Sequence, residues 1–131
     1  NEFDFSFSGL KTFAVNLVHN ASQKGEEVKP EDLGASFIKT VTDILTKNTI
    51  SAAKDNNVKQ IVLAGGVSAN SRLRKKMAEE REKNGFKLYM PELKYCGDNA
   101  AMIACAGYYL FDENINLDLS LNAIPSLSIE N

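Results

Sequence analysis

Two adjacent glycines, Gly65 and Gly66, end a short apolar run and stand just before a charged, helix-forming segment. This order of strand, glycine turn and helix start lets a backbone approach a phosphate. Glycine has no Cβ, and the first amides of a helix point outward at the positive end of its dipole. A tight turn without a ligand has the same pattern, and a short glycine motif is a weak signal. The residues alone leave both interpretations open.

Polar side chains follow the glycines at once and recur further along the chain. Ser68 and Asn70 come first, and the amide of Asn70 suits a ribose or adenine edge, unless it bonds its own backbone at the helix start. Asp98 stands at another helix start, where a carboxylate is usually an N-cap. It becomes a metal ligand only if other ligands come from elsewhere, because such cations need several. His19 has no His or Cys partner at ligand spacing, so we interpret it as a helix-surface residue.

The order of strand, helix, strand and helix predicts a parallel strand pair that positions these side chains. Ligands collect at the carboxyl ends of parallel strands, so the polar residues after both strands are expected to face one crevice. They are Ser68, Asn70, Asp98 and Asn99. The expected helices are 8–23, 30–55, 68–84 and 98–113, the expected strands are 59–64 and 86–90, and the tail is 114–131.

Capping residues and helical spacing predict where the helices begin and which faces they bury. We expect Ser8 to cap the first helix, Asp98 or Asn99 to begin the last, and the tail to be an edge strand or a docked arm. The predicted buried face of helix 8–23 is Leu10, Phe13, Ala14, Leu17 and Ala21. That of helix 30–55 is Leu33, Phe37, Val41, Ile44, Leu45 and Ala52.

The composition limits the class of protein. A chain of 131 residues with 44% hydrophobic residues is one domain or part of one, and its formal charge of −2 gives no whole-chain attraction to nucleic acid. Cys96 and Cys105 lack a CxxC spacing, which suits a reducing cytosol, and no run approaches the roughly 18 apolar residues of a membrane span. A local RNA contact and a solvated helix face are both open for the one tight basic cluster. It consists of Arg72, Arg74, Lys75 and Lys76.

Three motifs occur in order: FDFSFSGLKT at 3–12, AGGVSAN at 64–70 and CGDNAAMIA at 96–104. Together they closely resemble the C-terminal half of the bacterial tRNA N6-adenosine threonylcarbamoyltransferase family (TsaD), formerly called glycoprotease or O-sialoglycoprotein endopeptidase. The resemblance implies an α/β fold: part of a ribonuclease-H-like lobe of the actin/Hsp70/sugar-kinase superfamily, helix-rich, with a short parallel strand pair. It also implies an acyltransferase that moves threonylcarbamoyl from threonylcarbamoyl-AMP to N6 of the adenosine beside the anticodon, in tRNAs reading ANN codons.

The same resemblance implies roles for individual residues. Asn70 would contact the adenylate, together with Gly65, Gly66 and Ser68 of its motif. Asp98 would ligate one divalent metal per full-length protein, iron or zinc, which would polarise the threonylcarbamoyl carbonyl as a Lewis acid. The residue that moves the proton is not identified.

Two departures from the family pattern shape the expectation. Gly97 stands where the family usually has threonine, and the family's His-x-x-x-His metal ligands and first Ser-Gly-Gly phosphate loop are absent. Residues 1–131 are therefore expected to be a C-terminal fragment, inactive alone, with self-association covering the Leu33–Leu45 face and the sheet edge. For the full-length protein, the resemblance implies a cytoplasmic location, tRNA and threonylcarbamoyl-AMP as substrates, TsaB and TsaE as partners, and no membrane partner.

Two alternatives belong to other functional classes. One is a sugar or carboxylate kinase of the same superfamily, and the other is a non-catalytic scaffolding or dimerisation homologue. The carboxylate of Asp98 discriminates the transferase from the scaffold, because only the transferase needs it for metal retention and tRNA modification.

Overall fold

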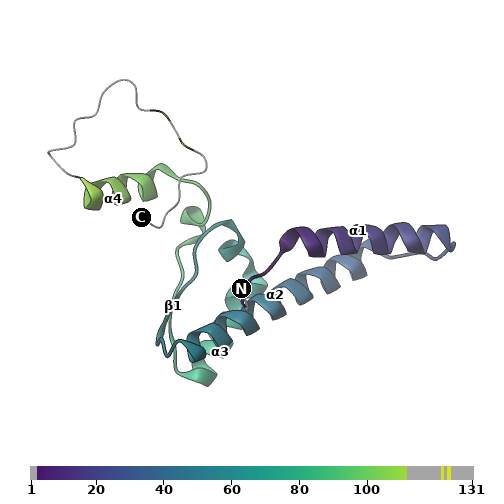
Figure 1. Cartoon of the computed structure of the whole chain (residues 1–131), viewed down its shortest axis with the longest axis horizontal. Coiled ribbons are helices and arrows are strands. Elements are labelled where there is room, and N and C mark those ends of the chain that lie inside the picture. The colour runs from purple at the N-terminus through teal and green to yellow at the C-terminus, as the bar shows by residue number, and fades with distance from the viewer. Residues whose placement is uncertain (1–2, 112–121, 123, 125–131) are drawn as a thin grey trace. The chain divides into compact units, whose positions relative to one another are not determined.

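The computed structural model describes residues 3–111, 122 and 124, and Figure 1 shows its elements. The chain divides into two compact units, Asn1–Asp98 and Asn99–Asn131. The first contains α1 (Phe7–Gln23), α2 (Pro30–Asp55), β1 (Gln60–Val62), the 3-10 helix η1 (Gly66–Ala69), α3 (Ser71–Asn84), β2 (Lys87–Tyr89) and the 3-10 helix η2 (Leu93–Tyr95). The second contains α4 (Ala100–Leu110). Apart from residues 122 and 124, the predicted tail 114–131 lies outside the described residues.

β1 and β2 form a parallel pair, as the order of elements predicts. The partners in the ladder are Gln60 with Lys87, Ile61 with Leu88 and Val62 with Tyr89. The fold class, helix-rich α/β with a short parallel strand pair, is confirmed. Both strands are shorter than the sequence predicts. Three residues of each strand enter the ladder. The carboxyl ends of β1 and β2 lie at the same edge of the sheet, so the segments that follow them leave from that edge.

The core of the first unit lies where α3 meets α2 and the sheet. Met77 is 1% exposed and Leu73 is 5% exposed, so α3 presents these side chains to the interior. The other buried members of the cluster are Ile50, Ala53, Ile61 and Phe86. A two-stranded sheet is marginal by itself, so packing against α3 is what makes this pair stable.

The buried face of α2 differs from the predicted apolar stripe. Val41 is buried as predicted, whereas Leu33, Phe37, Ile44, Leu45 and Ala52 are only half-buried. Thr42 and Thr46 are 1% and 2% exposed. The Thr42 hydroxyl donates to the carbonyls of Ile38 and Lys39 at 2.9 and 3.0 Å, so the helix itself satisfies this buried polar group. The fully buried face of α2 is Val41, Thr42, Thr46, Ile50 and Ala53.

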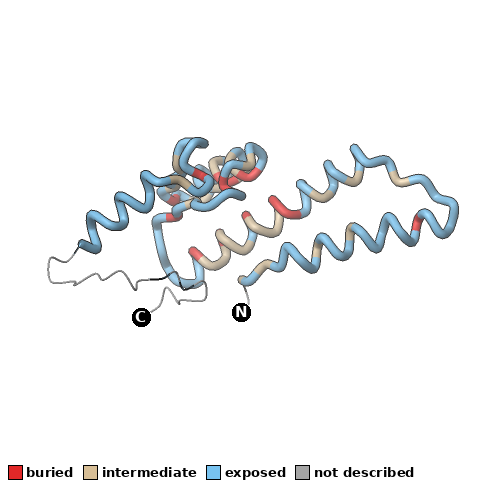
Figure 2. The backbone as a smooth tube through the Cα atoms, turned by 90° about the horizontal axis from the view of Figure 1, so that it is seen from above, coloured by how far each residue is buried: buried red, intermediate tan, exposed pale blue. Residues whose placement is uncertain are grey.

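The face predicted to be buried on α1 is buried only at Ala21, since Leu10 and Ala14 are half-buried and Phe13 and Leu17 are exposed. Figure 2 shows α1 pale blue along almost its whole length, and Ala21 is the one buried residue in this helix. Phe13 is 64% exposed and Leu17 is 37% exposed. The polar connection to α2 is anchored at this end, because the amide of Glu26 donates to the carbonyl of Ala21 at 2.9 Å.

Several helix starts lie a few residues from their predicted positions. Ser6, not Ser8, caps α1, because Ser6 has extended backbone and its Oγ accepts from the Gly9 amide at 3.2 Å. Asn99, not Asp98, caps α4, and its side chain accepts from the Met102 amide at 2.9 Å. α4 ends at Leu110 rather than at 113, since the next residue is extended.

An ion-pair cluster between α2 and α3 gives a pH-dependent prediction. Asp43 accepts hydrogen bonds from Lys39 at 2.7 Å and from Lys76 of α3, and these bonds lower the pKa of its carboxyl to about 2. A carboxyl with a depressed pKa adds stability above its unfolded pKa and loses it as the pH falls through the folded value. We expect Asp43→Asn to lower the urea midpoint at pH 7, with the difference from wild type shrinking between about pH 4 and about pH 2.

Asp55→Asn is the matched control, since this exposed carboxylate at the end of α2 forms no ion pair with the described residues. Its urea midpoint should stay close to that of wild type at every pH. A difference between Asp43→Asn and wild type that does not change with pH would contradict the assigned ion pair.

Candidate functional site

The glycine turn, residues 65–70, leaves β1 and leads into α3. Gly65 has φ 81° and ψ 171°, a backbone conformation that is essentially reserved for glycine. Its carbonyl accepts from both the amide and the hydroxyl of Ser68, at 3.0 and 2.7 Å. The Ser68 side chain is 3% exposed, so its hydroxyl holds the turn together from the inside.

The outer side of the glycine turn is open. A Cβ placed on Gly65 or on Gly66 would meet no described atom within 4 Å, and both residues are exposed. The sequence predicts a helix from residue 68, but η1 intervenes and α3 begins at Ser71. The two glycines therefore offer bare backbone at the start of η1, ahead of α3, and glycine lets a phosphate approach such a backbone.

Asn70 is the N-cap of α3. Its Oδ1 accepts from the Leu73 amide at 3.0 Å. Asn70 therefore bonds its own backbone at the helix start, which is one of the two interpretations given for this residue above. Its amide nitrogen has no hydrogen-bond partner among the described residues. Capping therefore uses the acceptor of the side chain and leaves the donor for a ligand.

The aspartate loop, residues 91–98, leaves the sheet after β2. Cys96 is 3% exposed, and its thiol lies 3.6 Å from the carbonyl of Glu92. Asp98 is exposed and has neither a hydrogen bond nor an ion pair with the described residues. The predicted single crevice for Asp98 and the turn stays a prediction, because no contact joins them.

Arg74 links the two segments, a role that sequence analysis missed when it placed this residue in the basic cluster. Its Nη1 donates to the carbonyl of Ser68 at 3.1 Å and lies 3.8 Å from Cys96 Sγ, while its Nη2 donates to the carbonyl of Pro91 at 2.8 Å. Helical spacing could have indicated that Arg74 is partly buried. It follows Leu73 directly and stands three residues before Met77, and both of these residues are buried. A half-buried arginine beside such a face needs acceptors.

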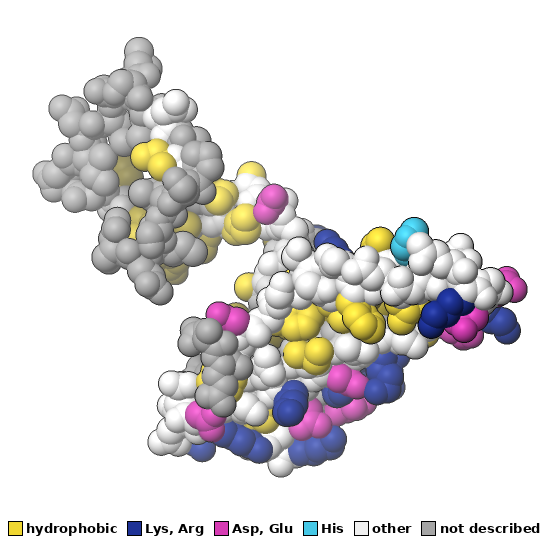
Figure 3. Space-filling model, turned by 45° about the vertical axis from the view of Figure 1, so that its right-hand side comes forward, with side chains coloured by type: hydrophobic (Ala, Val, Ile, Leu, Met, Phe, Trp, Pro, Cys, Tyr) yellow, Lys and Arg dark blue, Asp and Glu magenta, His cyan; other side chains and the backbone are white. Residues whose placement is uncertain are grey.

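The basic cluster divides, because Arg72, Lys75 and Lys76 line one hollow between α2 and α3 and Arg74 does not. Arg74 turns toward the loops, and Lys76 binds Asp43, while Arg72 and Lys75 are exposed. Figure 3 shows positive and negative side chains intermixed over this part of the molecule. Opposite charges at close range reduce the attraction for a polyanion, so the cluster by itself is weak support for an RNA contact.

The predicted metal ligand has no companions in the described part of the chain. Within it, no group of three or more His, Cys, Asp or Glu side chains is placed to hold a metal ion. His19 lies exposed on α1 as predicted, with its Nε2 3.0 Å from Nε2 of Gln23.

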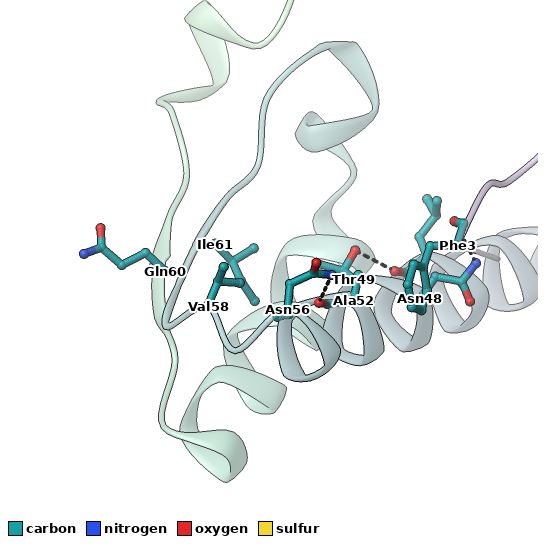
Figure 4. Close-up of a pocket in the computed structure, with 10 residues that line it drawn as sticks. Phe3, Asn48, Thr49, Ala52, Asn56, Val58, Gln60 and Ile61 are labelled. Carbon is teal, nitrogen blue, oxygen red and sulfur yellow. Dashed lines mark hydrogen bonds between the residues drawn. The ribbon is translucent and has the colours of Figure 1, made fainter. Parts of the chain in front are cut away.

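Two of the hollows beside α2 are apolar, and they differ in their relation to the turn. A groove of about 440 Å³ is lined by Asn48, Ala52 and Ile61 among others, and Asn48 donates to the carbonyl of Phe3 at 3.2 Å (Figure 4). This groove contains none of the predicted site residues. A smaller cavity of about 190 Å³ includes Ser68 in its lining, which is largely apolar.

Comparison with known proteins decides the family. The model of the family described as TsaD, tRNA N6-adenosine threonylcarbamoyltransferase, matches residues 1–105. The chain belongs to the TsaD family. This family is part of the actin/Hsp70/sugar-kinase superfamily, as the resemblance implies.

Individual TsaD relatives agree with this assignment. Proteins named tRNA N6-adenosine threonylcarbamoyltransferase from Bacillus cereus and Bacillus thuringiensis are each 50% identical over 131 residues, covering 99% of this chain. One from Geobacillus thermodenitrificans is 48% identical over 128 residues, covering 97% of the chain. The chain spans 38% of the length of the Bacillus relatives and 37% of the Geobacillus relative.

The cap at Asn70 gives a stability prediction for this TsaD chain. Asn70→Ala removes the acceptor for the Leu73 amide, and we expect the free energy of unfolding to fall by about 1 kcal/mol. Asn70→Ser keeps a capping oxygen and should stay close to wild type. Urea denaturation measures both, and equal losses for the two variants would contradict the assigned cap.

The two glycines of the turn give a second, paired prediction. Gly65→Ala forces a Cβ residue into a conformation reserved for glycine, and we expect a loss of about 1–3 kcal/mol in the free energy of unfolding. Gly66 has no positive φ and open space around it, so Gly66→Ala should leave the free energy nearly unchanged. Thermal denaturation compares them. A larger loss at Gly66 than at Gly65 would show that the turn is built differently.

Proposed function

We propose that this chain is the C-terminal part of a threonylcarbamoyltransferase. The full-length enzyme would transfer threonylcarbamoyl from threonylcarbamoyl-AMP to N6 of the adenosine beside the anticodon, in tRNAs that read ANN codons. The observation that carries the proposal is the family match over residues 1–105. The chain is also 50% identical to proteins named for this reaction. Because the chain covers 38% of those proteins, we propose that residues 1–131 alone are inactive.

The glycine turn supports a role in holding the adenylate. The open backbone of Gly65 and Gly66 allows close approach of a phosphate, and the amide nitrogen of Asn70 is a donor for the nucleoside. The first amides of α3 favour negative charge at the other end of this turn, where Asn70 caps the helix. Ser68 contributes by fixing the shape of the turn, since its hydroxyl is bonded to the Gly65 carbonyl.

Such a turn contributes to the reaction by stabilising the leaving group. The N6 nitrogen attacks the carbonyl carbon of the threonylcarbamoyl group, the bond from that carbon to the phosphate oxygen breaks, and N6 loses a proton. AMP leaves with its negative charge, which backbone donors at the turn would stabilise. We assign no described residue to the proton transfer.

The metal implied by the family is a separate question. Asp98 presents an exposed carboxylate, but a structural or catalytic site needs at least three protein ligands, and the described residues contain no such group. These residues alone do not form a metal site. We propose that Asp98 contributes one ligand to an iron or zinc ion whose other ligands lie outside this chain.

The remaining proposals concern location and partners. We propose a cytoplasmic enzyme, because its proposed substrate is tRNA, and TsaB and TsaE as its protein partners. None of the helices in the described residues is long and apolar enough to cross a bilayer. We also propose that the isolated chain self-associates through the exposed apolar face of α1, which light scattering can test.

Removing the Asp98 carboxylate tests the function. In the full-length protein, Asp98→Ala should lower the iron or zinc content at least tenfold, since even outer-sphere changes weaken metal sites about 10–100-fold. Transfer of labelled threonylcarbamoyl to a tRNA transcript should be lost in parallel. Asp55→Ala, at an exposed carboxylate on α2, is the matched control and should change neither measurement.

Other outcomes point to other functions. Unchanged metal content and unchanged tRNA modification in Asp98→Ala would favour the non-catalytic homologue. Phosphorylation of a sugar or carboxylate by ATP, without transfer to tRNA, would favour the kinase. Modification of tRNA by residues 1–131 alone would show that the fragment proposal is wrong.

A further inference from the structure

Arg74 bonds both segments that leave the sheet at the carboxyl ends of its strands. Its guanidinium donates to a carbonyl of the glycine turn, at Ser68, and to a carbonyl of the aspartate loop, at Pro91. It also lies against the buried thiol of Cys96, two residues before Asp98. The base of the side chain is fixed because α3 packs against α2 and β2.

The chemistry of this contact requires arginine. A guanidinium holds several donors in a rigid planar fork and keeps its charge, so one group can serve two carbonyls at once. Hydrogen bonds with a charged donor are about twice as strong as neutral ones. A lysine ammonium at the same place is a flexible point charge, and its donors are not arranged to bridge these two acceptors.

We propose that Arg74 is a positioning residue that fixes the aspartate loop relative to the glycine turn. It would hold the carboxylate of Asp98 at a constant separation from a group bound at the turn. The inference rests on the proposed function, in which the turn holds the adenylate and Asp98 acts on the group to be transferred. Misplacing a reacting group by about 1 Å costs on the order of a hundredfold in rate.

Three variants of the full-length protein test this role. Arg74→Met removes the donors and keeps a long apolar stem, and Arg74→Lys keeps the charge without the fork. Arg81→Met is the matched control, because Arg81 lies on the same helix, is exposed, and its side chain forms a surface ion pair with Glu82. Hydrogen exchange and the steady-state kinetics of transfer are measured for each.

Hydrogen exchange gives the structural result independently of activity. We expect Arg74→Met to raise exchange in residues 65–70 and 91–98 on the order of tenfold, as loss of a charge-assisted hydrogen bond predicts, with α2 unchanged. A uniform rise across α2 and α3 would show global destabilisation and overturn the inference. If Arg74→Met does not fold, the same comparison is made with Arg74→Lys, where we expect a smaller rise in the same two segments.

Kinetics separates positioning from stability. We expect kcat to fall on the order of 10–100-fold in Arg74→Met and less in Arg74→Lys, with the KM for threonylcarbamoyl-AMP changing much less. Unchanged kcat per folded molecule would overturn the inference while the transferase function stands. A wild-type protein without transfer activity would overturn the proposed function, and the exchange experiment would still decide whether Arg74 joins the two loops.

Discussion

Burial of Leu73 and Met77 beneath α3 is the interaction on which the rest of the first unit depends. Each strand contributes only three residues to the ladder, and backbone hydrogen bonds over such a length do not make an independent sheet. The apolar contacts of α3 with α2 and with Ile61 and Phe86 supply the missing stabilisation. The strand pair, and with it the common edge from which both loops leave, exists because this helix covers it.

The same helix then carries the groups that organise that edge. The buried face of α3 fixes its rotation, and its first turn presents Asn70 as the cap and Arg74 as the link between the loops. Ser68 closes the glycine turn with its own hydroxyl, so the turn needs no external partner to keep its shape. Core packing, helix capping and loop geometry are therefore successive consequences of one helix position.

Local signals made part of this architecture predictable from the sequence. Gly65 stands where a positive φ is required, and the order of strands and helices determines a parallel pair. Thr42 was not predicted as a core residue, because an apolar pattern cannot show that a threonine hydroxyl will bond its own helix. The first cap is Ser6 rather than Ser8, and the two serines are equivalent in the sequence pattern. The backbone decides between them, since Ser6 is extended and Ser8 already lies within the helix. Arg74 was misassigned because its acceptors are backbone carbonyls, which no sequence motif marks.

The two sides of the proposed site differ in how much of their chemistry this chain contains. The Ser68 hydroxyl and the Gly65 carbonyl inside the glycine turn are paired with each other, so the turn keeps its shape without a ligand. Asp98 is the opposite case, because a single exposed carboxylate neither selects a cation nor fixes its geometry. A link such as Arg74 matters most in this situation. In the role that we propose for it, Arg74 joins the loop of Asp98 to the self-contained turn, and the carboxylate then has a defined position relative to that turn.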